Sequence, residues 1–347
     1  MGASVEPGEI HAMTPRPVSL TRPSSSLRLP NWRWRPAEIA FWITAVAVFF
    51  VLPGRLMLGN QVLIAGLFAL SLDLILGYAG IVSLGHAAMF GTGAYTAALL
   101  ARHGWGEPLT GLLAAGAVAA ALAYVTSFIA VRGGDLTRLL VTLGIGLLLY
   151  EAANQASSVT GGVDGLGDVP MRKVLGLFRF DLEGRTAYLY SLVVVFLLFC
   201  FARVIVRSPF GLSLRGIRDG AARMPAIGSP VRRRLTAIYT IAGGVAGVAG
   251  ALLAQTTQFV GLEVLGFERS AYCVIMLVLG GVGWLYGALV GAAVFMIAQD
   301  VLSSINPVYW QFWLGLLLVL VVLFARGGIM GGLGSLWLWL FARPRAK

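Results

Sequence analysis

Charged side chains are scarce in this chain. Only 12% of its 347 residues are Asp, Glu, Lys or Arg, whereas 58% are hydrophobic and 45 are glycine. About a quarter of the residues in a typical soluble domain are charged, so this composition excludes that class and is typical of a membrane protein. Lysine occurs only as Lys173 and Lys347, and arginine therefore carries the net charge of +11. The arginines lie between apolar runs, which favours orientation in a membrane over binding of nucleic acid.

The residue patterns of most enzyme sites are also missing. The sequence has no HExxH, CxxC or GxSxG motif, and its two cysteines, Cys200 and Cys273, lie in apolar runs at no metal or redox spacing. A P-loop needs Gly-Lys followed by Ser or Thr, but Lys173 follows Arg172 and Lys347 ends the sequence. These absences disfavour an enzyme and predict no cofactor or metal. Any ATP that drives this protein must bind another subunit.

The two ends of the chain differ from its middle. Residues 1–36 are rich in Pro, Ser and Arg without an apolar core, so we expect a disordered cytosolic tail and not a secretory signal. Residues 327–347 are expected to form a cytosolic C-terminal tail. A helical span needs about 20 apolar residues. The transmembrane domain over 37–326 offers ten candidates, at 37–54, 56–77, 81–101, 109–131, 136–157, 187–206, 235–256, 264–280, 284–304 and 311–325.

One connection fixes the orientation of these spans. Residues 207–234 contain seven arginines and a single acid, Asp219, and Arg-rich short loops stay in the cytosol. Ten crossings that start inside place this loop, the turn at 132–138 and the C-terminal tail in the cytosol. The loop at 158–186 then lies outside, with four acids against four bases. Because all Arg-dense segments fall on one side, parity supports ten spans.

Glycine is dense in two segments of the predicted spans, 81–101 and 278–291, the second of which joins the spans at 264–280 and 284–304. Each follows a Leu-Gly step, at Leu76-Gly77 and Leu279-Gly280. Glycine at this density allows close helix packing, or breaks a helix where its backbone lines a cavity. Paired interruptions in two halves of a chain suggest an internal repeat with a pathway at its interface. We expect structural roles for five of these glycines, Gly77, Gly80, Gly280, Gly281 and Gly283.

Ionisable residues also occur within the spans. An acid at the bilayer centre costs about 2.5–3.5 kcal/mol, which the many apolar residues of 56–77 offset for Asp73. Asp73 should therefore face protein or water, in an interhelical bond or on a pathway. His86 is either a structural hydrogen-bonding residue or a substrate ligand. Glu151 and Asn154 either line an outward vestibule or are simply solvated. Further charges lie near span ends, at Asp300 and at Glu268 beside Arg269.

The arginine loop contains a helix-like pattern. Ser208-Pro209 and Gly211 punctuate its start, and apolar residues then recur at near-helical spacing among arginines until Pro225 and Gly228. The pattern predicts a short amphipathic helix. Such a helix fills a groove on a partner protein or lies on anionic lipid headgroups.

Five ordered stretches resemble one family, the branched-chain amino acid ABC importer permeases of the LivM/LivH type. The clearest similarity runs from Gly77 to Tyr95, through Ser83, Gly85 and His86. The others are 132–143, the outer segment at 160–165, 208–228 followed by 246–252, and 279–291. The resemblance covers about residues 60–330, and the outer segment points to the LivM branch.

The resemblance implies a fold and an assembly. The fold is the all-α, polytopic type II importer permease with about ten transmembrane helices, in the bacterial inner membrane with both termini cytoplasmic. The implied partners are a second homologous permease, two cytosolic ATPases and a periplasmic substrate-binding protein. On this basis we expect ATPase coupling through Arg215, Ile217, Arg218, Asp219 and Gly228. The expected translocation pathway includes Ser83, Gly85, His86, Glu151 and Asn154.

Two departures leave the exact substrate and ATPase partner open. The segment after Asp219 is Gly220 to Pro225 where the family usually has polar or acidic residues, and the proline should shorten the coupling helix. Trp284 and Ala288 also replace residues common in the family. The sequence thus predicts a permease subunit that imports branched-chain or related amino acids. Alternatives are a urea or short-chain amide ABC permease and a secondary transporter working alone, with a membrane enzyme disfavoured.

Overall fold

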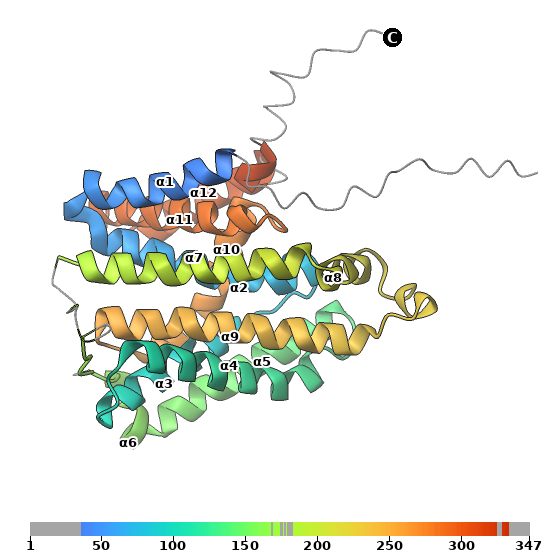
Figure 1. The fold of residues 1–347 in the computed structure, drawn as a ribbon, viewed down its shortest axis with the longest axis horizontal. Helices are drawn as coiled ribbons and strands as arrows, with labels where there is room; N and C mark the ends of the chain where they lie inside the picture. Colours follow the sequence, from blue (N-terminus) through green and yellow to red (C-terminus); the bar gives the residue numbers. More distant parts are fainter. Residues whose placement is uncertain are drawn as a thin grey trace, which may run out of the picture.

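The computed structural model describes residues 36–167, 169–173, 176, 178, 183–324 and 328–332 (Figure 1). Its regular elements are helices, as predicted, and an isolated bridge between Leu166 and Val260 is the extended pairing within these residues. The predicted N-terminal tail, apart from Pro36, and the predicted C-terminal tail, apart from residues 328–332, lie outside them.

Each of the ten predicted spans corresponds to a helix. These helices are α1 (Pro36–Val51), α2 (Leu56–Ala79), α3 (His86–Arg102), α4 (Pro108–Ala130), α5 (Asp135–Gln155), α7 (Arg185–Arg207), α9 (Val231–Thr257), α10 (Phe267–Gly280), α11 (Leu285–Ile305) and α12 (Trp310–Phe324). Shorter elements connect them: α6 (Ser157–Thr160), α8 (Pro209–Gly220), η1 (Pro53–Arg55), η2 (Gly162–Asp164), η3 (Met224–Ile227) and η4 (Leu262–Leu265).

Six of the described helices are long and apolar enough to cross a membrane by themselves: α2 together with η1, α4, α5, α7, α9 and α11. The remaining four, α1, α3, α10 and α12, have 14 to 17 residues, below the length that spans a bilayer unaided. The structure therefore supports a polytopic membrane protein, while ten full crossings remain a prediction.

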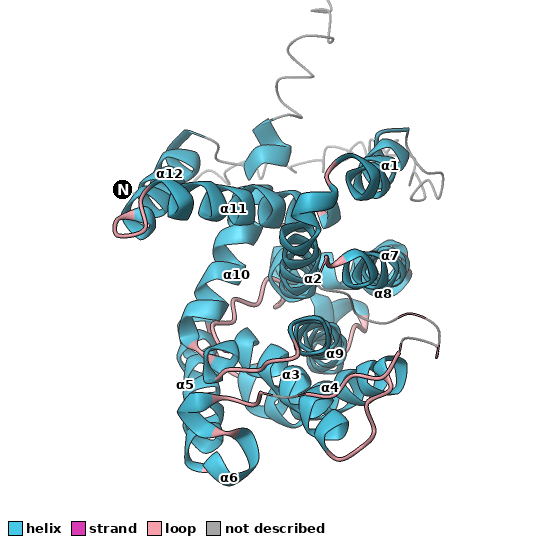
Figure 2. Ribbon diagram, turned by 90° about the vertical axis from the view of Figure 1, so that its left-hand side faces the viewer, coloured by secondary structure: helices cyan, strands magenta, loops and turns pink. Residues whose placement is uncertain are grey.

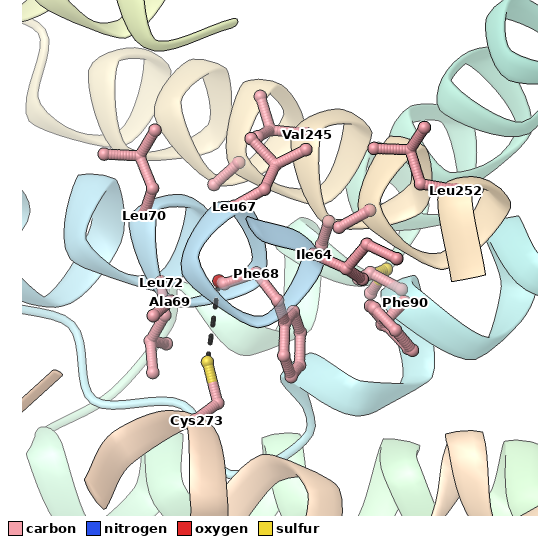
Figure 3. Close-up of a cluster of buried hydrophobic side chains, with 14 of the residues drawn as sticks. Ile64, Leu67, Phe68, Ala69, Leu70, Leu72, Phe90, Val245, Leu252 and Cys273 are labelled. Atoms are coloured by element: carbon pink, nitrogen blue, oxygen red, sulfur yellow. Dashed lines mark hydrogen bonds between the residues drawn. The ribbon is translucent and has the colours of Figure 1, made fainter. Parts of the chain in front are cut away.

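Helix α2 forms the centre of the bundle. Figure 2 shows it end-on, with α7, α9, α10 and α11 around it. Most of its length is buried, and Figure 3 shows its side chains Ile64, Leu67 and Phe68 packed close to α9 and α3. Lipid provides no hydrophobic drive between helices, so close packing of this kind has to hold the bundle together.

Small residues bring α9 into contact with α3 and α4. A Cβ atom added to Gly93 would lie 2.0 Å from the carbonyl oxygen of Gly247, and one added to Gly250 would lie 1.9 Å from that of Phe90. Neither position can carry a side chain without moving a helix. The glycines of α9 thus set the close approach on which the lower half of the bundle in Figure 1 is built.

The connection from α2 to α3 is not helical. Helix α2 ends at Gly80, whose φ of 73° is left-handed, and α3 begins only at His86. The prediction of a helix from residue 81 is wrong for this first part of the span. His86 contacts Ser71 of α2, so the connection runs back about 12 Å along α2, at 1.5 Å per residue. Non-helical backbone at membrane depth is tolerated because protein buries it, as it does Ile81 and Ser83.

Helix α5 lies at an edge of the molecule beside α10 (Figure 2). Little of it is buried, and four of its leucines, Leu136, Leu140, Leu147 and Leu148, are exposed. A helix this apolar and this uncovered requires lipid or another protein subunit against it.

Candidate coupling site and substrate pathway

The predicted amphipathic helix of the arginine loop is present as α8. Ser208 caps its first turn by accepting a hydrogen bond from the Gly211 amide, and Pro209 occupies the first helical position, where its missing N–H has no cost. Leu214 and Ile217 on its apolar side are buried. The helix ends at Gly220, and Pro225 lies in the short η3 that follows; that the proline shortens α8 stays a prediction. Gly228 then closes η3 in a left-handed conformation with φ of 79°.

Arg218 connects α8 to the C-terminal end of α2. Its Nη1 donates a hydrogen bond to the carbonyl oxygen of Gly77, 141 residues earlier in the chain. Its aliphatic stem fills the space beside Gly80, where an added Cβ would lie 2.8 Å from Arg218 Cγ. The neighbouring Arg215 lies over the Tyr78 ring, with its guanidinium carbon 5.3 Å from the ring centroid. The two predicted coupling arginines thus both contact the last turn of α2.

The C-terminal part of α2 also contacts the second glycine motif, which contains Gly283. Asp73 is fully buried, and its Oδ1 accepts a hydrogen bond of 2.7 Å from the amide of Gly283. A Cβ added to Gly77 would lie 2.1 Å from that oxygen and 2.6 Å from the Gly283 nitrogen. Gly77, Gly283 and Arg218 are therefore packed together. The turn between α10 and α11 is linked through α2 to α8.

The opposite side of the α8 region is free of the bundle. Asp219 is exposed, 3.4 Å from Arg218 Nε. Leu212 is 66% exposed and Ile227, in η3, is 75% exposed. Ile217, which we expected among the coupling residues, is buried instead and holds α8 on the bundle. Exposed apolar side chains between charges are typical of a protein-docking surface.

The predicted pathway residues fall into two separate groups. Ser83, Gly85 and His86 are in the interior, where His86 Nε2 lies 2.7 Å from Ser71 Oγ and the imidazole stacks on Phe68. The Ser71 hydroxyl donates a hydrogen bond of 2.6 Å to the Phe68 carbonyl oxygen, so in the His86–Ser71 bond the His86 nitrogen is the donor. This bond fits the structural role that we weighed for His86, and its place on the pathway stays a prediction.

Gly85 explains how this interior segment is attached to α5. A Cβ at Gly85 would lie 1.9 Å from the Thr142 carbonyl oxygen, and the Leu84 amide donates to Thr142 Oγ1 at 3.2 Å. By contrast, Glu151 is exposed near the C-terminal end of α5, where it accepts a hydrogen bond of 2.7 Å from Gln155, and Asn154 is half-buried nearby. The structure does not bring the two groups together.

A polar cavity of about 340 Å³ lies elsewhere, between α2, α3, α10 and α11. Its charged lining residues are Glu263 of η4 and Glu268 and Arg269 of α10. Our sequence reasoning placed Glu268 and Arg269 near the end of a span and did not assign them to the pathway. The signal was present as an arginine in an apolar segment, but its partners come from helices distant in the sequence.

Part of the predicted outer loop is hydrogen-bonded to the rest of the protein. Leu166 and Val260 exchange backbone hydrogen bonds of 2.8 and 3.0 Å, and the Arg172 amide donates to the Gly106 carbonyl at 2.9 Å. Gly161, Gly162 and Gly165 all have positive φ, as the predicted turns require. Val163 between them is 81% exposed. Asp168 and Asp181, two of the acids counted in this loop, lie outside the described residues.

The sequence of residues 54–322 matches the family described as "Branched-chain amino acid transport system / permease component". The chain belongs to this family. The matched range runs from η1 into α12 and includes α8, both glycine motifs and the polar cavity. The chain is therefore a multi-pass permease of a transport system, and the resemblance seen in its motifs is confirmed.

Individual relatives agree with this assignment. The permease is 30% identical over 319 residues to the high-affinity branched-chain amino acid transport system permease protein LivM of Salmonella typhimurium, covering 84% of this chain and 74% of that one. LivM of Escherichia coli matches with the same identity and coverage. The L-arabinose ABC transporter permease protein AraH of Azospirillum brasilense is 30% identical over 158 residues, covering 42% of this chain and 46% of its own. No solved structure matches the permease.

Proposed function

We propose that this permease is a subunit of an ATP-driven importer in the bacterial inner membrane, and that it carries branched-chain or related amino acids inward. Support comes from the family match and from the two LivM relatives, which cover most of the chain. The similarity to an arabinose permease covers less than half of it and carries less weight. A urea or short-chain amide importer is the alternative substrate class.

The proposed importer has separate ATPase subunits, because the sequence has no P-loop. We place their docking surface at Leu212, Arg215, Asp219 and Ile227, which α8 and η3 expose. The observation that carries the coupling role is the Arg218 hydrogen bond to Gly77. Through that bond and the Asp73–Gly283 bond, a movement of α8 reaches both α2 and the turn before α11. A coupling route of this kind needs a physical chain of contacts.

Two further partners complete the proposal. A second permease would cover the exposed apolar face of α5 and form the pathway together with this chain, in a heterodimer. A periplasmic substrate-binding protein would dock on the outer side, where the 158–186 loop exposes Val163. ATP binding and hydrolysis would then switch the pathway from outward to inward access.

Leu212→Glu tests the docking surface. The substitution places a charge at the centre of an apolar contact without touching the bundle, so we expect at least a tenfold loss of ATPase that co-purifies with the membrane-inserted permease. Val163→Glu on the outer loop is the matched control, with the same type of change at a similarly exposed residue. Co-purification of ATPase with Leu212→Glu at the wild-type level would remove the assignment.

Transport itself separates the importer from a carrier that works alone. Reconstituted with its partner permease, ATPases and binding protein, the wild-type permease should accumulate radiolabelled leucine in liposomes only when ATP is supplied on the cytosolic side. Leucine uptake by the isolated chain without ATP would contradict the proposal and favour a secondary transporter.

A further inference from the structure

The polar cavity between α2, α3, α10 and α11 combines charge with an apolar floor. The floor is made of the buried side chains Ile64, Phe68, Phe90, Met276 and Phe295. Figure 3 shows Ile64, Phe68 and Phe90 gathered at the junction of α2 and α3. The charged groups at its other side are Arg269, Glu263 and Glu268. The volume of about 340 Å³ is at the lower end of the range for small-molecule sites.

Arg269 is half-buried, and residues that follow it on α10 pack into the bundle. The next residue, Ser270, accepts a hydrogen bond of 2.9 Å from the Ala87 amide in the first turn of α3. One turn further, Cys273 Sγ lies 3.5 Å from the Phe68 carbonyl oxygen of the central helix α2, drawn as the dashed line in Figure 3. The Arg269 guanidinium lies over the Phe90 ring, 5.8 Å from its centroid. The first turn of α10 thus starts at the depth at which α3 starts.

This guanidinium has an unused binding capacity. Within the described residues no carboxylate lies within 4.0 Å of Arg269, and none of the ion pairs there includes it. Glu263 is close enough to act on it electrostatically, and Glu268 is its neighbour in the sequence. A charge inside a membrane protein is costly without a partner, and such residues mark substrate pathways.

We propose that this cavity binds the zwitterion of an aliphatic amino acid. The Arg269 fork binds the α-carboxylate in two parallel hydrogen bonds, the acids Glu263 and Glu268 face the α-ammonium, and the aliphatic side chain points to the Phe68–Phe90 floor. Arginine suits this task because its planar fork matches the geometry of a carboxylate. The proposal rests on the proposed function and adds the place at which this chain holds its substrate.

The cavity lies between the proposed outer side of the bundle and the glycine turn that α2 links to α8. Gln61, near the outer end of α2, and Gln299, near the outer end of α11, line it together with Glu263, which follows the outer end of α9. Its floor reaches Met276, and α10 continues from there to the Gly280–Gly283 turn that bonds Asp73. Substrate held on Arg269 is therefore one helix away from the turn that α2 links to α8.

Arg269→Gln in the assembled importer is the first test. In liposomes with ATP and leucine-loaded binding protein, we expect leucine uptake to fall at least tenfold, while the complex still assembles and hydrolyses ATP. Arg269→Lys should give an intermediate uptake, because the charge is retained and the fork is lost. Arg102→Gln, at an exposed arginine at the end of α3 outside the cavity, should transport like wild type. Wild-type uptake by Arg269→Gln would overturn the site.

Labelling of Gln299→Cys, with Cys200 and Cys273 replaced by alanine, tests the site even if Arg269→Gln does not assemble. Leucine should slow the reaction of this cysteine with a methanethiosulfonate reagent at least tenfold more effectively than 4-methylpentanoate, which lacks the ammonium, or 3-methylbutylamine, which lacks the carboxylate. Equal effects of the three compounds, or no effect of leucine, would overturn the zwitterion site. Absence of ATP-dependent uptake by the wild-type importer would instead contradict the proposed function.

Discussion

At the scale of single residues, the most constrained position is Gly77. Its neighbours are the Asp73 carboxylate and the Gly283 amide, and its own carbonyl accepts the Arg218 hydrogen bond. The sequence predicted a structural glycine here and an interhelical bond as one possibility for Asp73. It did not predict that the two predictions concern the same contact, because Gly283 and Asp73 are 210 residues apart.

Gly77→Ala should therefore be strongly destabilising. The methyl group would lie 2.1 Å from Asp73 Oδ1, and we expect a loss of about 1–3 kcal/mol from overpacking, measured as a lower unfolding midpoint of the purified permease. Gly144→Ala in α5 is the control, because no atom lies within 4 Å of its added Cβ. It should be neutral or stabilising by up to about 1 kcal/mol, since alanine favours a helix. Equal midpoints for the two variants would contradict this account.

At the scale of elements, α1 shows an attachment that hydropathy does not indicate. Its Glu38 lies 2.8 Å from Arg203 and 3.6 Å from Arg207, both in α7; the Arg203 side chain is buried, and the Glu38 side chain is 12% exposed. The sequence predicted a span at 37–54 and placed Arg207 in the arginine loop, but it predicted no ion pair between the two. The ion pair holds the apolar helix α1 against the C-terminal part of α7.

Glu38→Gln should loosen α1. Removing one charge from a largely buried ion pair is strongly destabilising, by about 3–5 kcal/mol, so we expect a clearly lower unfolding midpoint and faster proteolysis between α1 and α2. Glu183→Gln provides the comparison, because its 2.8 Å pair with Arg185 is exposed and such pairs contribute about 0–1 kcal/mol. A similar effect for both substitutions would mean that the buried pair is not what fastens α1.

The segment at 81–101 shows what sequence patterns cannot predict. The glycines of 81–101 predicted either close packing or a broken helix, and the structure has both: a non-helical run to Gly85 and then a closely packed α3. The choice depends on the Thr142 backbone of α5, which occupies the space beside Gly85. Local composition carries no information on that neighbour.

At the scale of the whole molecule, the arginine loop and the outer loop lie at opposite ends. Figure 1 places α8 at one end of the long helices and α6 towards the other. This separation agrees with the predicted orientation, in which the arginines face the cytosol. The orientation itself comes from charge and not from packing, since a folded bundle has no preference for either side of a membrane.

Cysteine labelling measures that orientation. In a background with Cys200 and Cys273 replaced by alanine, a membrane-impermeant maleimide should label Val163→Cys in spheroplasts and label Ile227→Cys only after the membrane is opened. Both residues are more than 70% exposed, so differences in burial do not explain a difference in labelling. The reverse pattern would invert the topology, and equal labelling from outside would contradict an odd number of crossings between the two sites.

The sequence by itself determined the class of this protein, its helices and its family, and it predicted the orientation, because hydropathy, charge and short motifs are local properties. It also placed a short amphipathic helix between Ser208 and Pro225 and structural glycines at the two motifs. Only the tertiary structure decided which of these residues meet: Arg218 with Gly77, Asp73 with Gly283, and Arg269 with Phe90 over an apolar floor. These contacts depend on how closely helix backbones approach, which is set jointly by side chains that lie far apart in the chain.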